Sequence, residues 1–279
     1  MSSALSPIAR RPLWKRLGGR FRSAIRRSLN LIDRASDPSG APVPPAHLRI
    51  YYYRTRDLDA FVRARESVGV EVRTHGLKPA DRVLDIGSGI GNLALALAGT
   101  HQGTYDGIEI NREAAAWCQR AITPRDPRFR FHHADVEGGA YNRGGRLSAS
   151  QYRFPFEADR FDFVFLGSVF THMLPPDVAH YLREIARVLA PGGTCVASAF
   201  LLNDERRADV AAGRAFMVFP FEIQSGRLHD RERPEAAVAI EERFVLEAYG
   251  AAGLTVEGIR RGQWWTGRAD DQDVVTARG

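Results

Sequence analysis

Three glycines at alternate positions follow a short apolar run that contains the acidic residue Asp85. They are Gly87, Gly89 and Gly91. A glycine-rich turn between a buried strand and a helix lets a ligand lie against bare backbone. Glu109 ends the next apolar run, about 20 residues on, where a carboxylate accepts hydrogen bonds from both hydroxyls of a ribose. The spacing predicts a nucleoside site; the alternative is a structural turn with a solvated glutamate.

The acidic residue before the turn helps to choose the nucleoside. The dinucleotide pattern is G-x-G-x-x-G, whereas here the spacing is G-x-G-x-G and Asn92 stands where the third dinucleotide glycine would be. The carboxylate of Asp85 would repel a pyrophosphate but would accept a hydrogen bond from an ammonium group. We therefore expect a cofactor with an amino-acid tail and a ribose, as in S-adenosylmethionine. A nicotinamide-linked oxidoreductase is the less favoured alternative.

Three further landmarks follow in order along the chain. They are H-A-D-V at residues 133–136, the apolar run F-D-F-V-F-L at residues 161–166 and L-A-P-G-G at residues 189–193. With the glycine turn, these landmarks make residues 76–279 resemble the class I S-adenosylmethionine-dependent methyltransferases. Within that family, the stretches S-V-F-T-H-M and E-I-A-R-V-L-A-P-G-G are most similar to bacterial small-molecule and glycan enzymes.

The resemblance implies a cofactor-binding set at the strand ends and on the glycine turn. In this sequence the set is Asp85, Gly87, Ser88, Gly89, Gly91, Glu109, Ile110, Asp135, Val136 and Ser168. Asp85 and the turn would line the methionine portion, and Glu109 would hold the ribose. Asp135 would accept from the exocyclic amine of the adenine, unless it only caps a turn at its strand end. Ser168 would lie near the sulfonium.

His172 is the candidate catalytic residue. Methyl transfer is an in-line displacement, and a base is needed only when the acceptor is a hydroxyl that must lose its proton. Imidazole suits that role near neutral pH. The alternative is a histidine that orders its loop through a backbone hydrogen bond.

Two missing motifs narrow the reaction. The Asn/Asp-Pro-Pro-aromatic tetrapeptide of adenine and glutamine N-methyltransferases does not occur, nor does a carboxylate set spaced like the magnesium site of catechol-type enzymes. We expect metal-independent O-methylation of a small molecule or of a glycan or lipid-linked acceptor. N- or C-methylation and a non-catalytic cofactor-binding module remain alternatives, and a nucleic-acid substrate is disfavoured.

Alternating apolar runs and helical patterns predict the elements that position these residues. Strands are expected at 82–86, 104–110, 129–135, 161–167, 194–200, 254–261 and 272–278. Helices are expected at 58–72, 90–99, 111–122, 176–190 and 241–252. The predicted fold is α/β, a doubly wound, mostly parallel, seven-stranded Rossmann-like sheet whose last strand is antiparallel.

Two long stretches between these elements are candidates for a lid and an acceptor pocket. They are residues 137–157 and a cap insertion at about 203–239. The second contains several arginines, which favours an anionic acceptor. The alternative is packing elsewhere or a contact between subunits.

Charge and proline content divide the chain into three predicted parts. They are a basic segment at 1–35, a proline-rich linker at 36–46 and a methyltransferase domain at 47–279. The net charge of the whole chain is +6, yet residues 1–34 hold nine basic residues and one acidic residue. Apolar residues at helical spacing in this segment predict an amphipathic basic helix, and residues 10–34 could bind an anionic membrane surface. The two cysteines suit a reducing interior. We expect a cytoplasmic protein, possibly peripheral on the inner face of the membrane.

Overall fold

The computed structural model describes the chain except residues 1–36, 38, 140, 213–214, 216 and 267–270. The predicted basic amphipathic segment at 1–35, and with it the expected membrane contact, lies outside the described residues.

Five parallel strands form the centre of the sheet in the order β3-β2-β1-β4-β5. Their bounds are Val83–Ile86 (β1), Tyr105–Glu109 (β2), Phe129–His133 (β3), Phe161–Leu166 (β4) and Leu189–Leu202 (β5). Chain order reverses between β1 and β4, so a crevice for ligands is expected at the carboxyl ends of these strands. The predicted doubly wound sheet is confirmed.

The remaining strands make the sheet larger than the seven predicted. β10 (Asp273–Arg278) runs antiparallel to β5, as expected, and β9 (Thr255–Arg260) pairs with β10. Three short strands come from the cap insertion: β6 (Phe221–Ile223), β7 (Gly226–Leu228) and β8 (Val238–Glu241). Because β8 pairs in parallel with the end of β5, the described sheet has ten strands. Segments of three or four residues have too little periodicity to be recognised in the sequence.

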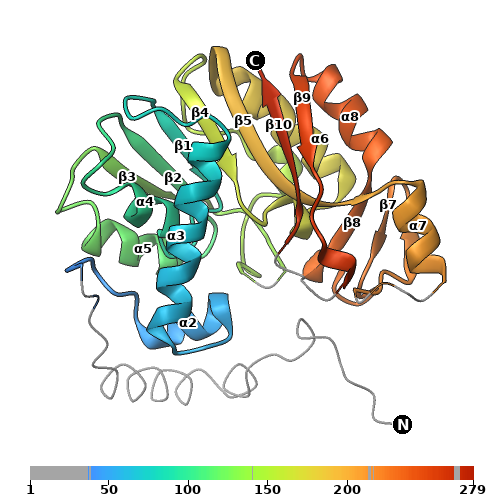
Figure 1. Cartoon of the computed structure of the whole chain (residues 1–279), viewed down its shortest axis with the longest axis horizontal. Coiled ribbons are helices and arrows are strands. Elements are labelled where there is room, and N and C mark those ends of the chain that lie inside the picture. Colours follow the sequence, from blue (N-terminus) through green and yellow to red (C-terminus); the bar gives the residue numbers. More distant parts are fainter. Residues whose placement is uncertain (1–36, 38, 140, 213–214, 216, 267–270) are drawn as a thin grey trace.

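Helices cover both faces of the sheet (Figure 1). One face packs against α3 (Leu58–Thr74), α4 (Asn92–Leu97) and α5 (Arg112–Ala121), and the other against α6 (Pro175–Val188) and α8 (Glu242–Ala251). The Asn111 side chain accepts from the backbone N–H of Glu113 at 3.0 Å, which makes it the predicted N-cap of α5.

Two helices were not expected from the sequence. α2 (Ala46–Tyr53) begins where the proline-rich stretch ends, and α7 (Asp204–Ala211) opens the cap insertion. The described residues also form short 3₁₀ helices: η3 (Ala149–Gln151), η4 (Phe170–His172), η5 (Pro234–Ala236) and η6 (Trp264–Thr266). Figure 1 shows α2 at the end of the molecule where the parallel strands terminate.

A third apolar cluster joins the insertion to the sheet. Trp264 is fully buried against Phe200 and Phe219, and its indole N–H donates to Asp273 at 2.8 Å. Trp264 thus closes the sheet edge. In the part of the chain that the structure covers, no helix has both the length and the apolar character needed to cross a bilayer.

Candidate functional site

The glycine turn is bound to the neighbouring strand at the carboxyl edge of the sheet. The backbone N–H groups of Gly87 and Ser88 donate to the Ile108 carbonyl at 2.8 and 2.9 Å. Gly87 has φ +78°, and a Cβ there would stand 2.5 Å from Cγ2 of Val169. Glycine is therefore required by both conformation and space. Gly91 has φ +80° and lies against Ile122, so it serves the packing of α4.

Glu109 lies directly beside this turn. Its carboxylate accepts from the backbone N–H of Gly89 at 2.7 Å and from that of Asn111 at 2.6 Å, and the residue is 4% exposed. Burial raises the pKa of Glu109, while these hydrogen bonds oppose the rise. The structure therefore brings Glu109 and the glycines together, as the spacing predicts.

Asp85 is the second buried carboxylate of the site. The Tyr105 hydroxyl donates to it at 2.5 Å, and the residue is 3% exposed. Burial raises the pKa of Asp85 to about 7, with a further rise from the charge of Glu109. Such a group gains most from a cationic partner, because an ammonium would offset the cost of burying its charge.

Aromatic side chains from two elements close over the turn. The Tyr52 ring of α2 lies 3.3 Å from where a Cβ on Gly89 would stand. Tyr141, from the 137–157 stretch, has its ring centroid 5.5 Å from Tyr51, 6.0 Å from Tyr52 and 5.6 Å from His172. The α2 tyrosines were not predicted as site residues, although three consecutive tyrosines at 51–53 were a visible signal.

Unpartnered polar atoms around the turn indicate that this site suits a polar ligand. Among the described residues, three buried atoms around the turn have no hydrogen-bond partner: the hydroxyls of Tyr52 and Ser88 and the amide oxygen of Asn92. Buried polar groups normally have partners, so a ligand is the natural supplier. Together with the two carboxylates and the bare glycine backbone, these atoms fit a nucleoside with an amino-acid tail.

The predicted adenine contacts lie at the next strand end. Ile110 packs on the 137–157 stretch, where a Cβ on Gly138 would stand 2.5 Å from its Cδ1. Val136 is buried in the core. The Asp135 carboxylate accepts from Nε of Arg146 at 2.5 Å, and this hydrogen bond lowers its pKa. Asp135 therefore already has a cationic partner, which an adenine amine would have to replace or share.

His172 lies in η4, after the end of β4. Its Nδ1 donates to the backbone carbonyl of Glu235 at 3.0 Å, so Nε2 holds the lone pair when the ring is neutral. Burial lowers the pKa of His172, so the ring is neutral near pH 7. The backbone hydrogen bond at Nδ1 is the one expected if His172 only orders its loop. The same bond leaves the lone pair on Nε2, so a role as a base is also compatible with this geometry.

Ser168 sits between β4 and η4 with its side chain exposed and φ +58°. Its backbone N–H donates to the Ser198 hydroxyl at 2.8 Å, and its own hydroxyl accepts from the Gln272 amide at 2.8 Å. Gln272 was not predicted as a site residue, and the sequence offers no signal for it.

Most of the described arginines in the cap insertion have acidic partners. Arg206 pairs with Glu205 and Asp209 and lies over the Trp265 ring. Most of the others also have acidic partners: Arg207 with Asp204 and Glu241, Arg227 with Glu222, and Arg233 with Asp230. Arg214 lies outside the described residues. The composition that favoured an anionic acceptor is therefore largely explained by internal ion pairs.

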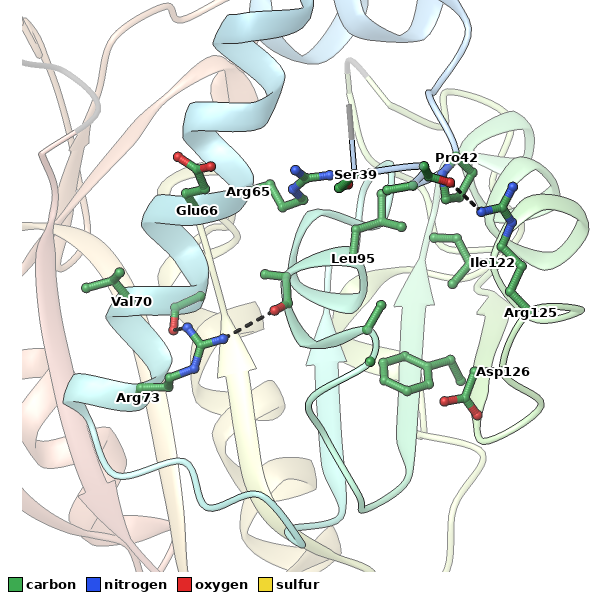
Figure 2. A pocket seen from close by; sticks show the side chains of 17 residues that line it. Ser39, Pro42, Arg65, Glu66, Val70, Arg73, Leu95, Ile122, Arg125 and Asp126 are labelled. Carbon is green, nitrogen blue, oxygen red and sulfur yellow. Dashed lines mark hydrogen bonds between the residues drawn. The ribbon is translucent and has the colours of Figure 1, made fainter. Parts of the chain in front are cut away.

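A groove of about 700 Å³ lies away from the glycine turn, between α3, the end of α4 and the segment after α5 (Figure 2). Its arginines are engaged within the protein. Arg73 donates to the carbonyls of Gly69 and Ala96, and Arg125 donates to that of Gly40. Figure 2 shows Glu66 and Val70 on the α3 side of this groove. Among the described residues, no group of three or more His, Cys, Asp or Glu side chains is arranged to hold a metal ion.

Known proteins resemble this chain in sequence and in fold. Residues 84–197 match the family model of the methyltransferase domain. The chain is 29% identical over 193 residues to 27-O-demethylrifamycin SV methyltransferase of Amycolatopsis mediterranei, covering 66% of this chain and 65% of that protein. It is 26% identical over 127 residues to demethylmenaquinone methyltransferase of Bacillus cereus, covering 45% and 47%. The chain thus spans less than two thirds of the length of these relatives.

A solved structure supports the fold. The 1,6-didemethyltoxoflavin-N1-methyltransferase of Burkholderia thailandensis, bound to S-adenosylhomocysteine, superposes with a TM-score of 0.52 over 88% of this chain and 96% of its own, at 21% identity. The strand order, the glycine turn with its buried acidic partner and the matching domain model agree with one another. The chain is similar to the class I S-adenosylmethionine-dependent methyltransferases in its matched domain, in its relatives and in its fold.

Proposed function

We propose that the protein transfers a methyl group from S-adenosylmethionine to a hydroxyl oxygen of a small molecule. The observation that supports this most is the position of Glu109, whose buried carboxylate is fixed by the N–H groups of Gly89 and Asn111 at the end of β2. A carboxylate fixed in this way accepts hydrogen bonds from ribose hydroxyls. The cofactor, when bound, supplies an electrophilic methyl group on its sulfonium.

The residues of this chain bind the cofactor and exclude water. The Asp85 carboxylate would accept from the ammonium of the amino-acid tail, and the Gly87–Gly89 backbone would lie along that tail. Tyr52 and Tyr141 would cover the site, since their rings already pack together above the turn. Orientation and a water-poor site supply most of the acceleration in a displacement of this kind.

His172 would accept the proton of the acceptor. Its Nδ1–H is held by the Glu235 carbonyl, which directs the neutral tautomer with a basic Nε2. Burial lowers its pKa, so the ring is available as a base at neutral pH. The new bond joins the acceptor oxygen to the methyl carbon as the bond from that carbon to sulfur breaks, and the acceptor proton moves to Nε2.

The name of one relative supports an oxygen acceptor, because it contains the position 27-O. The name of another, demethylmenaquinone methyltransferase, supports a small-molecule acceptor and specifies no oxygen. We extend to this chain only the class of small-molecule acceptor. An anionic acceptor stays a weaker proposal, because the arginines that suggested it are mostly paired with carboxylates.

Calorimetric titration is the first test. The protein should bind S-adenosylmethionine at micromolar concentration and should not bind NAD; NAD binding alone would overturn the cofactor assignment. A screen of hydroxylated small molecules with the methyl-labelled cofactor, read by product mass, would then find the acceptor. Methylation only at nitrogen or carbon would contradict the oxygen assignment.

The base is tested with His172→Gln once an acceptor is found. The variant should keep cofactor affinity and lose about 100-fold or more in kcat, the usual size of a general-base contribution. His180→Gln is the matched control, because His180 also binds a backbone carbonyl, that of Tyr152, but on α6. Equal kcat for His172→Gln and the wild type would leave His172 as a loop-ordering residue.

A further inference from the structure

Ser168 adopts a backbone conformation that its type disfavours. It is one of four described non-glycine residues with positive φ, here +58°. Such a conformation costs on the order of 1–3 kcal/mol and persists only where surrounding contacts impose it. The contacts around it come from Ser198 in β5 and from Gln272, the residue before β10.

Ser168, Ser198 and Gln272 form a closed ring of three hydrogen bonds. The Ser168 backbone N–H donates to the Ser198 hydroxyl at 2.8 Å, and that hydroxyl donates to the Gln272 amide oxygen at 2.6 Å. The Gln272 amide nitrogen then donates to the Ser168 hydroxyl at 2.8 Å. The Ser198 hydroxyl hydrogen is used within the ring, whereas the Ser168 hydroxyl accepts within the ring and keeps its own hydrogen for a partner outside it.

Gln272 is held firmly for this role. It is 9% exposed and directly precedes Asp273, which starts β10. The buried Asp273 carboxylate accepts from the N–H groups of Leu201, Gly262 and the Trp264 indole at 2.8–3.0 Å. Three strong contacts on the adjacent residue leave Gln272 little freedom to turn away from Ser168.

The ring also lies next to the reacting end of the site. Val169, the neighbour of Ser168, has its Cγ2 at 2.5 Å from where a Cβ on Gly87 would stand. His172 follows four residues after Ser168, in η4. The exposed hydroxyl of Ser168 is therefore on a segment that contacts the glycine turn through Val169 and also carries the candidate base, His172.

We propose that Ser168 donates a hydrogen bond to the acceptor oxygen and that Gln272, with Ser198, is the positioning residue that aims this donor. The assignment rests on the proposed function and makes it more specific. A hydroxyl or phenolic oxygen has two lone pairs, so one accepts from Ser168 while the other attacks the methyl carbon. A neutral amine has one lone pair, which the same donor would occupy. The ring thus selects oxygen acceptors over amines.

Alkylation of an introduced thiol tests the aim of the ring without any acceptor. In Ser168→Cys, the Gln272 amide would donate to the sulfur and favour the thiolate, which lowers the thiol pKa. The native Cys118 and Cys195 are fully buried and should not interfere. Adding Gln272→Met, or in a second variant Ser198→Ala, should slow alkylation by iodoacetamide at pH 7 by about 3- to 10-fold. S-adenosylhomocysteine should protect the thiol.

The probe for the Ser168 donor is 1-naphthol, compared with naphthalene, titrated into the S-adenosylhomocysteine complex. The wild type should bind 1-naphthol at least threefold more tightly than Gln272→Met does, because only the wild type aims the Ser168 donor at the naphthol oxygen. Naphthalene, which has no acceptor atom, should bind both proteins equally. Circular dichroism and thermal unfolding would check that the variants fold.

Three results would overturn the inference: alkylation rates independent of Gln272 and Ser198, a thiol that the cofactor product does not protect, or an equal effect of Gln272→Met on naphthol and naphthalene binding. Failure of the proposed function would look different, because S-adenosylmethionine would then not bind the wild type, or its methyl group would be found only on nitrogen or carbon. Intact cofactor binding with a ring-independent thiol would overturn the inference and leave the cofactor assignment in place.

Discussion

Two buried carboxylates set the properties of the site at the level of single residues. Asp85 and Glu109 lie on adjacent strands, and burial raises the pKa of both. Backbone N–H groups donate to Glu109 and the Tyr105 hydroxyl donates to Asp85, which partly offsets the cost of burying their charge. Among the described residues, neither carboxylate forms a salt bridge with a cation. The site without its ligand is thus an electrostatically costly arrangement that a cationic ligand would relieve.

The first prediction concerns the pH dependence of stability without cofactor. The native pKa of Asp85 is about 7 and its ordinary value is 3.8, so between these values the native state holds a proton that the unfolded state has released. The free energy of unfolding should therefore fall as pH rises from about 4 to 7, by up to about 1.4 kcal/mol per pH unit from this group. Asp85→Asn keeps an acceptor for Tyr105 and should flatten this fall in urea-unfolding curves.

The same variant should bind S-adenosylmethionine more than tenfold more weakly, about 1.4 kcal/mol, because its neutral amide no longer attracts the ammonium. Asp162→Asn is the control. Arg82 lowers the pKa of Asp162, so this carboxylate changes the free energy of unfolding only at more acidic pH. An unchanged pH slope and unchanged affinity in Asp85→Asn would remove Asp85 from the site.

At the level of elements, the start of β10 fastens the antiparallel edge to the rest of the sheet. Asp273 is 1% exposed and binds donors from β5, from Gly262 between β9 and η6, and from η6 itself. Because β10 pairs along β5, this contact also sets the position of Gln272 above the end of β4. The edge strand and the site therefore share one anchor.

The second prediction follows from this anchor. Asp273→Ala would leave buried N–H groups without partners, at a cost of roughly 1–3 kcal/mol for each group. We expect the free energy of unfolding, measured in urea, to fall by about 3 kcal/mol or more. Asp271→Ala is the matched control, because Asp271 makes a partly exposed ion pair with Arg260, and such pairs contribute about 0–1 kcal/mol. Similar losses in both variants would contradict the anchoring role.

At the level of the whole molecule, charge is distributed unevenly. Residues 1–34 have nine basic and one acidic residue and a net charge of +8; the remaining 30 basic and 32 acidic residues give −2. The domain that holds the glycine turn is therefore close to neutral, which does not suit a nucleic-acid substrate. A basic segment attached to a neutral domain suits binding to an anionic surface by the segment alone.

The third prediction tests that separation. Removal of residues 1–34 should leave affinity for S-adenosylmethionine unchanged and should reduce sedimentation with vesicles that contain phosphatidylserine or phosphatidylglycerol. Binding of the full chain should weaken with added salt, since each basic residue near such a surface contributes about 1 kcal/mol at low ionic strength. Neutral phosphatidylcholine vesicles are the control. Equal vesicle binding with and without the segment would rule out membrane docking through it.

The local pattern of the sequence was enough to predict the central strands, their flanking helices and the glycine turn with Glu109. Apolar runs, N-caps such as Asn111 and strand-end acids depend on near neighbours in the chain, so they are legible without a structure. The closeness of Glu109 to Gly89 also follows from chain order, because adjacent parallel strands end at one edge of a sheet.

Other features depend on contacts between distant residues, and only the tertiary structure decided them. The Gln272 bond to Ser168 joins residues 104 positions apart, and neither residue type has a pattern that predicts the other. The cover by Tyr52 depends on where α2 packs, and the strands β6 to β8 depend on pairing with the end of β5. Periodicity reports which face of an element is buried, whereas these contacts depend on which surfaces meet, and that is determined by the packing of the whole chain.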